Sequence, residues 1–97
     1  ALSLAQTARS LLPNSPDTAD TLAWIYYHKG NYDSGRDLLE DALKTSPNSA
    51  SIQYHLGMIY SKLSDKANAE VHLKKAAELA PNTQTAKDAE KELGLLG

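Results

Sequence analysis

Three histidines, His28, His55 and His72, are the side chains of this sequence best suited to metal or proton chemistry. Each falls in a different expected helix, and no two of them have the i, i+4 spacing of an HExxH zinc motif. Cysteine is absent from the 97 residues, so no thiolate can complete a metal site, form a disulfide or act as a nucleophile. We therefore expect the histidines to be ordinary surface or interface residues, and we expect no metal site.

Other groups that could take part in catalysis also lack the context that it requires. The serines stand in no nucleophile-elbow sequence, and Gly30, Gly35 and Gly57 form no phosphate-binding loop. Two groups of carboxylates are expected on solvated helix faces, at Glu40-Asp41 and at Asp88-Glu90. The sequence thus predicts neither an enzyme nor a bound cofactor.

Composition narrows the remaining classes of function. The chain has ten Lys and Arg against twelve Asp and Glu, with a formal net charge of −2. A nucleic-acid binder or a polybasic membrane anchor needs a strong positive charge, which this balance does not supply. No apolar run is long enough to span a bilayer. With 41% hydrophobic and 23% charged residues, the chain is typical of one small globular domain.

The elements that would position any site follow a repeat of 34 residues. Pro13, Pro47 and Pro81 lie 34 residues apart, and each is followed by Asn. Apolar residues recur at the same offset, as Leu22, Ile25, Tyr26, Leu39 and Ala42 and then as Leu56, Ile59, Tyr60, Leu73 and Ala76. A fixed period of this size indicates stacked helical repeats.

Hydrophobic spacing within this frame predicts an all-α fold of about six helices. The expected ranges are 1–12, 17–29, 33–45, 51–63, 67–80 and 83–93. At the first turn, Gly30 is expected to stop one helix in the left-handed conformation and Asn31 to cap the next. Ser64-Asp65 replaces this pair at the second turn. The last segment has the narrow apolar face of a terminal cap, and Gly94 is expected to end it.

The sequence resembles the tetratricopeptide repeat family through a spaced set of residues that occurs twice. The set is Leu56-Gly57, Tyr60, Ala69, Leu73, Ala76 and Pro81, and one period earlier Leu22-Ala23, Tyr26, Gly35, Leu39, Ala42 and Pro47. Ala23 and Gly35 stand where the family prefers Gly and Ala, and we interpret them as compensating small residues at a helix crossing. The resemblance divides a single domain, 1–97, into four parts. These are 1–15, the second helix of a truncated repeat; 16–49 and 50–83, two complete repeats; and 84–97, a capping helix.

A narrower likeness concerns the phrase DTLAWIYYHKGNY followed by YHLGMIY. It is similar to bacterial tetratricopeptide proteins of cell-envelope and exopolysaccharide export loci. The segment Ala1 to Leu12 lacks the basic start and apolar core of a signal peptide, so any targeting segment is expected outside this piece of a longer array. The compartment stays open between the bacterial cytoplasm and the periplasm or cell envelope.

The family resemblance implies a right-handed superhelix, an α-solenoid of antiparallel helix pairs. Its concave wall comes from the first helix of each pair and binds a peptide or a helical segment of a partner protein. Carried over by position, the groove residues are Asp17, Asp20, Trp24, Tyr27, His28, Ser51, Tyr54, Met58, Ser61 and Lys62. They also lie at three- and four-residue spacing beside the core stripes, not on them. The aromatic and methionine side chains among them offer a large and adaptable contact surface.

The charge of this predicted groove limits the partner. One subset of the family grips the carboxylate of a chaperone tail with Lys, Arg and Asn side chains. The matching places here hold Asp20, Trp24, Tyr54 and Met58, so a chaperone-tail receptor is not expected. Asp17 and Asp20 would favour a basic or neutral, partly apolar segment, unless both simply complement the dipole at the start of their helix.

Two alternatives stay open at this point. Trp24 could pack against a neighbouring repeat as core rather than line a groove, because tryptophan is usually highly buried. The chain could also be a structural spacer of a longer array, or self-associate through its N-terminal helix. That helix would present Leu4, Ala8 and Leu11 on one apolar face.

Overall fold

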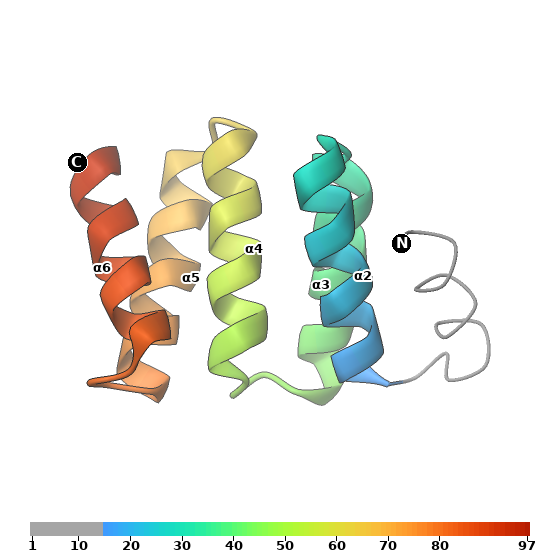
Figure 1. Cartoon of the computed structure of the whole chain (residues 1–97), viewed down its shortest axis with the longest axis horizontal. Helices are drawn as coiled ribbons and strands as arrows, with labels where there is room; N and C mark the ends of the chain where they lie inside the picture. The colour runs from blue at the N-terminus through green and yellow to red at the C-terminus, as the bar shows by residue number, and fades with distance from the viewer. Residues whose placement is uncertain (1–14) are drawn as a thin grey trace.

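The computed structural model describes residues 15–97, which form five α-helices and no strand (Figure 1). The helices are α2 Pro16–Lys29, α3 Tyr32–Thr45, α4 Ala50–Lys62, α5 Lys66–Leu79 and α6 Gln84–Leu96. For this part of the chain the all-α prediction is confirmed, with five helices rather than about six. The helix predicted over 1–12 lies outside the described residues.

Side-chain caps explain where several helices begin. Ser15 Oγ accepts a hydrogen bond from the Thr18 amide at 3.4 Å, and Ser49 Oγ accepts one from the Ile52 amide at 3.3 Å. Each bond satisfies an amide that the first turn of a helix leaves unpaired. Asn31 occupies the predicted cap position of α3, and its carbonyl accepts a hydrogen bond from the Gly35 amide at 3.2 Å, but its side chain makes no cap hydrogen bond.

The two turns inside the helix pairs use the same backbone conformation with different residues. Gly30 ends α2 at φ 82°, the left-handed conformation predicted for it. One period later Ser64 adopts φ 62°, where the Cβ atom of an L-residue is crowded by the backbone. The second turn therefore reproduces the first at a conformational cost that glycine would not carry.

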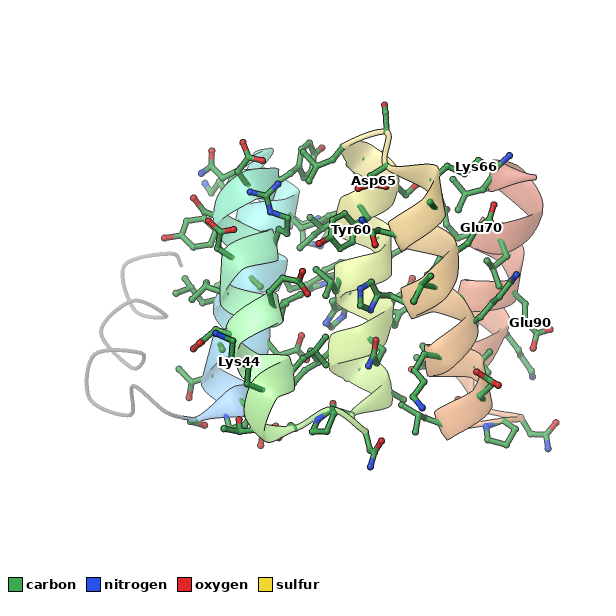
Figure 2. All side chains as sticks on the ribbon, turned by 180° about the vertical axis from the view of Figure 1, so that it is seen from behind. Lys44, Tyr60, Asp65, Lys66, Glu70 and Glu90 are labelled. Carbon is green, nitrogen blue, oxygen red and sulfur yellow. The ribbon has the colours of Figure 1, made fainter. Side chains whose placement is uncertain are left out.

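The helices pack as two antiparallel pairs, α2 with α3 and α4 with α5, and α6 extends the row. Figure 1 shows α2, α4 and α6 on the near side, and Figure 2 shows α3 and α5 in front when the molecule is seen from behind. Contacts also link α2 with α4 and α4 with α6. The first helices of successive pairs thus form one wall, and α6 takes the place of a further first helix in it.

The hydrophobic core lies between this wall and the second helices. Its fully buried large side chains are Leu39, Ile52, Leu56, Ile59 and Leu73. Burying a side chain of this size contributes about 1.5–3 kcal/mol. The core residues come from α3, α4 and α5, so α4 is the helix around which the described part of the chain is built.

Small residues let the paired helices approach closely. A Cβ atom on Gly57 would lie 2.7 Å from Leu73 Cγ, and one on Gly35 would lie 2.9 Å from Ile59 Cδ1 and 3.1 Å from the Ala23 carbonyl oxygen. Real Cβ contacts are essentially never shorter than about 3 Å, so a larger residue at either position must displace its neighbours. This geometry agrees with the interpretation of Ala23 and Gly35 as small residues at a helix crossing.

Two details of the predicted helices differ in the structure. Ile25 and Tyr26 were expected in the core and are only half-buried. Helix α6 does not end at Gly94 but continues to Leu96, which packs against the core residues of the preceding helices. The burial of Leu96 explains the extension, because tertiary packing outweighs the low helix propensity of one glycine.

Candidate protein-binding face

The predicted groove residues lie on the first helices of the two pairs, α2 and α4. Trp24, Tyr27, Tyr54 and Met58 are all half-buried, and we call these four residues the aromatic face. Among the polar members, Asp20 and Ser61 are half-buried, whereas the exposed ones are Asp17, His28, Ser51 and Lys62. The fold therefore gathers the large side chains in the wall and leaves most of the polar ones at its border.

Trp24 sits at the centre of the aromatic face as a packing residue. Tyr27 stacks on it from the same helix with ring centroids 4.3 Å apart, and His55 stacks on it from α4 at 4.0 Å. The Tyr27 ring is nearly parallel to the indole, with 7° between the planes, and the His55 ring is inclined by 26°. Tyr54 adds a tilted contact at 6.3 Å. Trp24 thus joins α2 to α4, and its ring is largely engaged in contacts with other rings of the wall.

A polar contact beside Trp24 also joins these two helices. The carboxylate of Asp20 accepts a hydrogen bond from Ser51 Oγ at 2.7 Å and lies 2.6 Å from His55 Nδ1. The Asp20 and His55 side chains are 14% and 19% exposed, so their pairing is shielded from water. From the sequence, Asp20 was expected only to complement a helix dipole or to line the groove, whereas in the structure its side chain links α2 to α4. His55, expected to be a surface or interface histidine, lies at the interface between α2 and α4.

Carboxylates of α6 border the aromatic face, which sequence reasoning missed. Ser61 Oγ donates a hydrogen bond to Glu92 Oε2 at 2.7 Å. Asp88 and Glu92 are half-buried, whereas Glu90 is exposed and points away from the body of the molecule in Figure 2. The expectation of a solvated face over Asp88-Glu90 is therefore right for Glu90 and wrong for Asp88. The signal was available, because one period added to Tyr54 and Met58 reaches Asp88 and Glu92.

The electrostatics of the tyrosines agree with this position of the carboxylates. Burial first, and then the charges of Asp88 and Glu92 together with the Tyr27 hydroxyl, raise the pKa of Tyr54 above its ordinary value. Burial, the nearby Tyr32 hydroxyl and then the Glu92 carboxylate raise the pKa of Tyr27 in the same direction. Both phenols therefore remain protonated at neutral pH and can donate hydrogen bonds at the border of the face.

A second polar cluster links α3, α4 and α5 around Tyr60, which is labelled in the view from behind (Figure 2). The Tyr60 hydroxyl donates to Glu40 Oε2 at 2.7 Å, and the His72 ring stacks on Tyr60 at 5.5 Å. His72 Nδ1 lies 2.7 Å from Gln53 Oε1, and Gln53 Nε2 donates to the Pro47 carbonyl at 2.9 Å. Glu40, expected on a solvated face, is exposed yet anchors this contact.

Burial and charge shift the titration of this second cluster. Burial, followed by the hydrogen bond and the charge of Glu40, raises the pKa of Tyr60 to about 12. Burial lowers the pKa of His72 below its ordinary value, although the Glu40 carboxylate acts in the opposite direction. A neutral His72 held by Gln53 and Tyr60 fits a structural contact between helices rather than a catalytic base.

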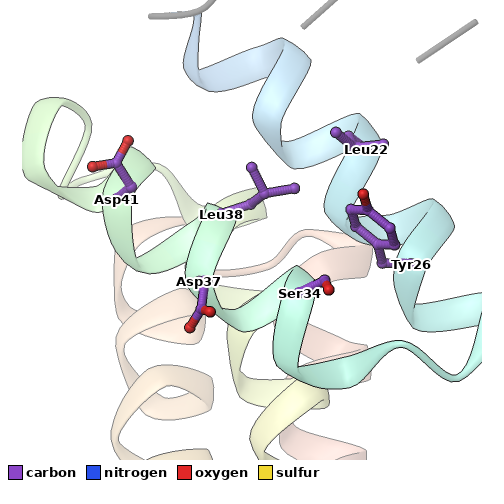
Figure 3. Close-up of a pocket in the computed structure, with 6 residues that line it drawn as sticks. All are labelled: Leu22, Tyr26, Ser34, Asp37, Leu38 and Asp41. Carbon is purple, nitrogen blue, oxygen red and sulfur yellow. The ribbon is translucent and has the colours of Figure 1, made fainter. Parts of the chain in front are cut away.

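A cavity of about 420 Å³ lies between α2 and α3, away from the aromatic face (Figure 3). It is lined by Leu22, Tyr26, Ser34, Asp37, Leu38 and Asp41. Its wall on α2 is mostly apolar, and its wall on α3 carries Ser34 and two carboxylates beside Leu38. The cavity is a hollow at the edge of the first helix pair.

Within residues 15–97, no group of three or more His, Cys, Asp or Glu side chains is arranged to hold a metal ion. No helix in this part of the chain is long and apolar enough to cross a membrane.

Comparison with known families agrees with this architecture. Residues 1–76 match the family model of the anaphase-promoting complex, cyclosome, subunit 3. A TPR repeat-containing protein of Methanocaldococcus jannaschii is 36% identical over 63 residues, which are 65% of this chain and 11% of that protein. The chain belongs to this matched family of tetratricopeptide-type repeat proteins. It spans only about a tenth of the length of the curated relative.

Solved structures show the same fold at low sequence identity. A chain of the Naa15/Naa10 complex bound to HypK-THB superposes with a TM-score of 0.80 at 22% identity. The superposition covers 98% of this chain and 14% of the other. A second neighbour, MamA MSR-1 C2, superposes with a TM-score of 0.71 at 21% identity, and the superposition covers 96% of this chain and 56% of the other. The bacterial cell-envelope setting stays a prediction.

Proposed function

We propose that this chain is a non-catalytic protein–protein interaction module. Its wall of first helices, α2, α4 and α6, binds a peptide or a helical segment of a partner protein in a concave groove. The observation that carries the proposal is the aromatic face, because four large side chains remain half-buried after the two helix pairs have packed. Large aromatic and methionine surfaces of this kind supply much of the binding energy at protein interfaces.

The proposed roles of the groove residues follow from their contacts. We assign partner contact to Tyr27, Tyr54 and Met58, with His28 and Lys62 at the exposed border. Trp24 positions Tyr27 and His55 instead of touching the partner with its ring faces. The remaining predicted groove residues, Asp17, Asp20, Ser51 and Ser61, form the polar border of the same groove.

The wider organisation that this proposal assumes is the one the family resemblance implies. We propose that 16–49 and 50–83 are complete repeats, that 84–97 caps them, and that 1–15 is the second helix of a preceding unit. Their stacking would continue as a right-handed superhelix. Repeats of this class contact only their neighbours, so a groove extends with each added pair. The Naa15/Naa10 complex bound to HypK-THB supports a role in protein assembly only by analogy of fold.

The experiment compares three forms of the chain as bait for proteins of the source cell. The first is wild type, the second carries Tyr54→Ala and Met58→Ala, and the third carries Val71→Ala and Leu95→Ala. Val71 and Leu95 are 60% and 73% exposed and lie outside the aromatic face, so the third form is a matched control for lost apolar surface. Helicity and unfolding midpoint are measured for each form.

We expect a partner that the wild type and the control retain and the face variant loses. Its purified complex should then weaken by about tenfold or more in the face variant, since truncating a central aromatic contact costs about 1–2 kcal/mol or more. Equal retention by all three folded forms would contradict the groove proposal.

A structural role in a longer array is the second candidate, and the cavity between α2 and α3 favours it. Leu22 and Leu38 line that hollow at the end of the described row of helices, where a neighbouring helix pair would pack. The chain would then act as a spacer or self-association segment. Sedimentation analysis of the chain with and without Leu38→Glu tests this role, because a charge in the hollow should disrupt any dimer formed through it.

A further inference from the structure

The border of the aromatic face carries a charge imbalance that bears on which partner it fits. Within the wall, α6 contributes the carboxylates Asp88 and Glu92, and α2 contributes the exposed Asp17. Lys62 is the one lysine among the predicted groove residues, and it lies at the exposed end of α4. Negative side chains therefore outnumber positive ones around the face.

The carboxylates of α6 are held in place and yet keep capacity for a ligand. Glu92 accepts a hydrogen bond from Ser61 through Oε2, and Asp88 accepts one from Gln84 Nε2 at 2.8 Å through Oδ1. Each carboxylate has a second oxygen and further lone pairs beyond these contacts. A carboxylate fixed by a neighbour loses less side-chain entropy when a cation binds to it than a freely rotating one does.

The aromatic side chains next to these carboxylates also suit a cation. Tyr54 packs with Met58 against the core cluster that α5 and α6 share, which places its ring on the side of the face nearest α6. A guanidinium or ammonium group is attracted both to the face of a tyrosine ring and to a nearby carboxylate. An apolar neighbour in the same ligand could contact Met58, whose flexible thioether adapts to different shapes.

We propose that the aromatic face selects a basic segment of a partner protein, in which Arg or Lys side chains reach Asp88 and Glu92 while adjacent apolar side chains pack on Tyr54 and Met58. This inference rests on the proposed groove function and names the chemistry of its ligand. The charge complementarity would speed encounter and set the register of the segment, and the aromatic contacts would supply most of the affinity.

The test uses the full chain and an array of 15-residue peptides that share one set of apolar positions. The remaining positions are filled with Arg in one series, Gln in the second and Glu in the third. Binders are then labelled with fluorescein and titrated by anisotropy. The two protein variants are Asp88→Asn with Glu92→Gln, which removes the border charges, and Glu78→Gln with Glu90→Gln as control. Glu78 and Glu90 are exposed, so the control removes the same net charge elsewhere.

The expected result is binding of Arg-series peptides that the border variant weakens by about three- to tenfold and the control weakens by less than about twofold. Raising the salt concentration should reduce the difference between the two variants, because it screens exposed charges. Each amide variant keeps the size and planar shape of the carboxylate and one acceptor oxygen, so circular dichroism should find both variants folded.

Other outcomes separate this inference from the groove function. Equal loss of affinity in both variants would overturn the assignment of Asp88 and Glu92. Preferential binding of the Gln or Glu series, with loss on Met58→Ala, would overturn the basic ligand and leave the groove standing. No binding in any series would overturn the basic ligand, while the pull-down comparison would still decide the groove itself.

Discussion

The two complete helix pairs carry the same residue types at equivalent positions and bury them differently. Ile59 and Tyr60 are 0% and 7% exposed, whereas Ile25 and Tyr26, one period earlier, are half-buried. Helix α4 contacts all four other described helices, and α2 contacts only α3 and α4 among them. In a stacked repeat, burial is therefore set by the neighbours of a helix as much as by its own sequence.

The pairs also differ in the polar groups that they bury. The second pair places His72 against Gln53, and the equivalent positions of the first pair hold Leu38 and Ala19. A hydrogen-bonded pair thus replaces an apolar one at the same place in the repeat. Such a pair is tolerated because its groups satisfy each other and the Pro47 carbonyl.

The largest effect that would sharpen this comparison is expected from truncating the equivalent isoleucines. Ile59→Ala should lower the free energy of unfolding by about 3 kcal/mol, because it opens a cavity at a fully buried site. Ile25→Ala should cost about 1 kcal/mol, since a half-buried side chain has less contact to lose. Urea denaturation followed by circular dichroism measures both, and equal costs would break the comparison.

The next effect concerns the small residues at the helix crossings. Gly57→Ala should destabilise the chain by about 1–2 kcal/mol, because the new Cβ would lie 2.7 Å from Leu73 Cγ. Adding Ala69→Gly reproduces the first pair, in which Ala23 and Gly35 occupy the two equivalent positions. The double variant should recover at least half of the lost stability. Thermal melts of the single and double variants decide this, and a double variant no better than the single one would disprove equivalence of the two crossings.

A smaller effect of opposite sign is expected at the turns. Ser64→Gly should stabilise the chain by about 0.5–1 kcal/mol, because glycine adopts the left-handed conformation without the Cβ penalty. Gly30→Ser should cost a similar amount at the first turn. Urea denaturation of the two variants measures both effects. If Ser64→Gly destabilised the chain instead, the Ser64 hydroxyl, or the smaller conformational freedom of serine in the unfolded chain, would outweigh the strain at this turn.

The smallest effect is the pH dependence that His72 gives to the second pair. Burial lowers the pKa of folded His72, while the unfolded residue keeps an ordinary pKa of about 6.5. Below that pH the unfolded state binds more protons, so the stability present above about pH 6.5 should be lost as the pH falls. The double variant His72→Leu, Gln53→Ala places at these positions the residue types that the first pair has. Its free energy of unfolding should therefore fall less as the pH drops below about 6.5. An unchanged profile would assign the loss to other groups.

Much of the fold could be predicted from the sequence because its signals are local and repeated. The period placed the turns, and the ranges expected for α2 to α5 agree with the observed helices to within a residue at most ends. Gly30 was identified from its position alone, since few other residues favour a positive φ. The end of α6 was missed because Leu96 packs against residues that are distant in sequence.

The candidate site could be predicted in outline but not in its contacts. The period selected the helices that form the wall and the large side chains on it. Asp88 and Glu92 occupy the equivalent places on α6 and were overlooked, because charged residues on a helix usually indicate a solvated face. Their positions, 34 residues after Tyr54 and Met58, identify them as part of the wall regardless of residue type.

The sequence by itself determined the helices, their order and the small residues at their crossings, because backbone hydrogen bonding and apolar spacing act over a few residues. Only the tertiary structure decided that Tyr27 and His55 cover Trp24 and that Asp20 pairs with His55. The last contact joins residues 35 positions apart. Its formation depends on the distance between two helices and on side-chain rotamers, which no local pattern encodes.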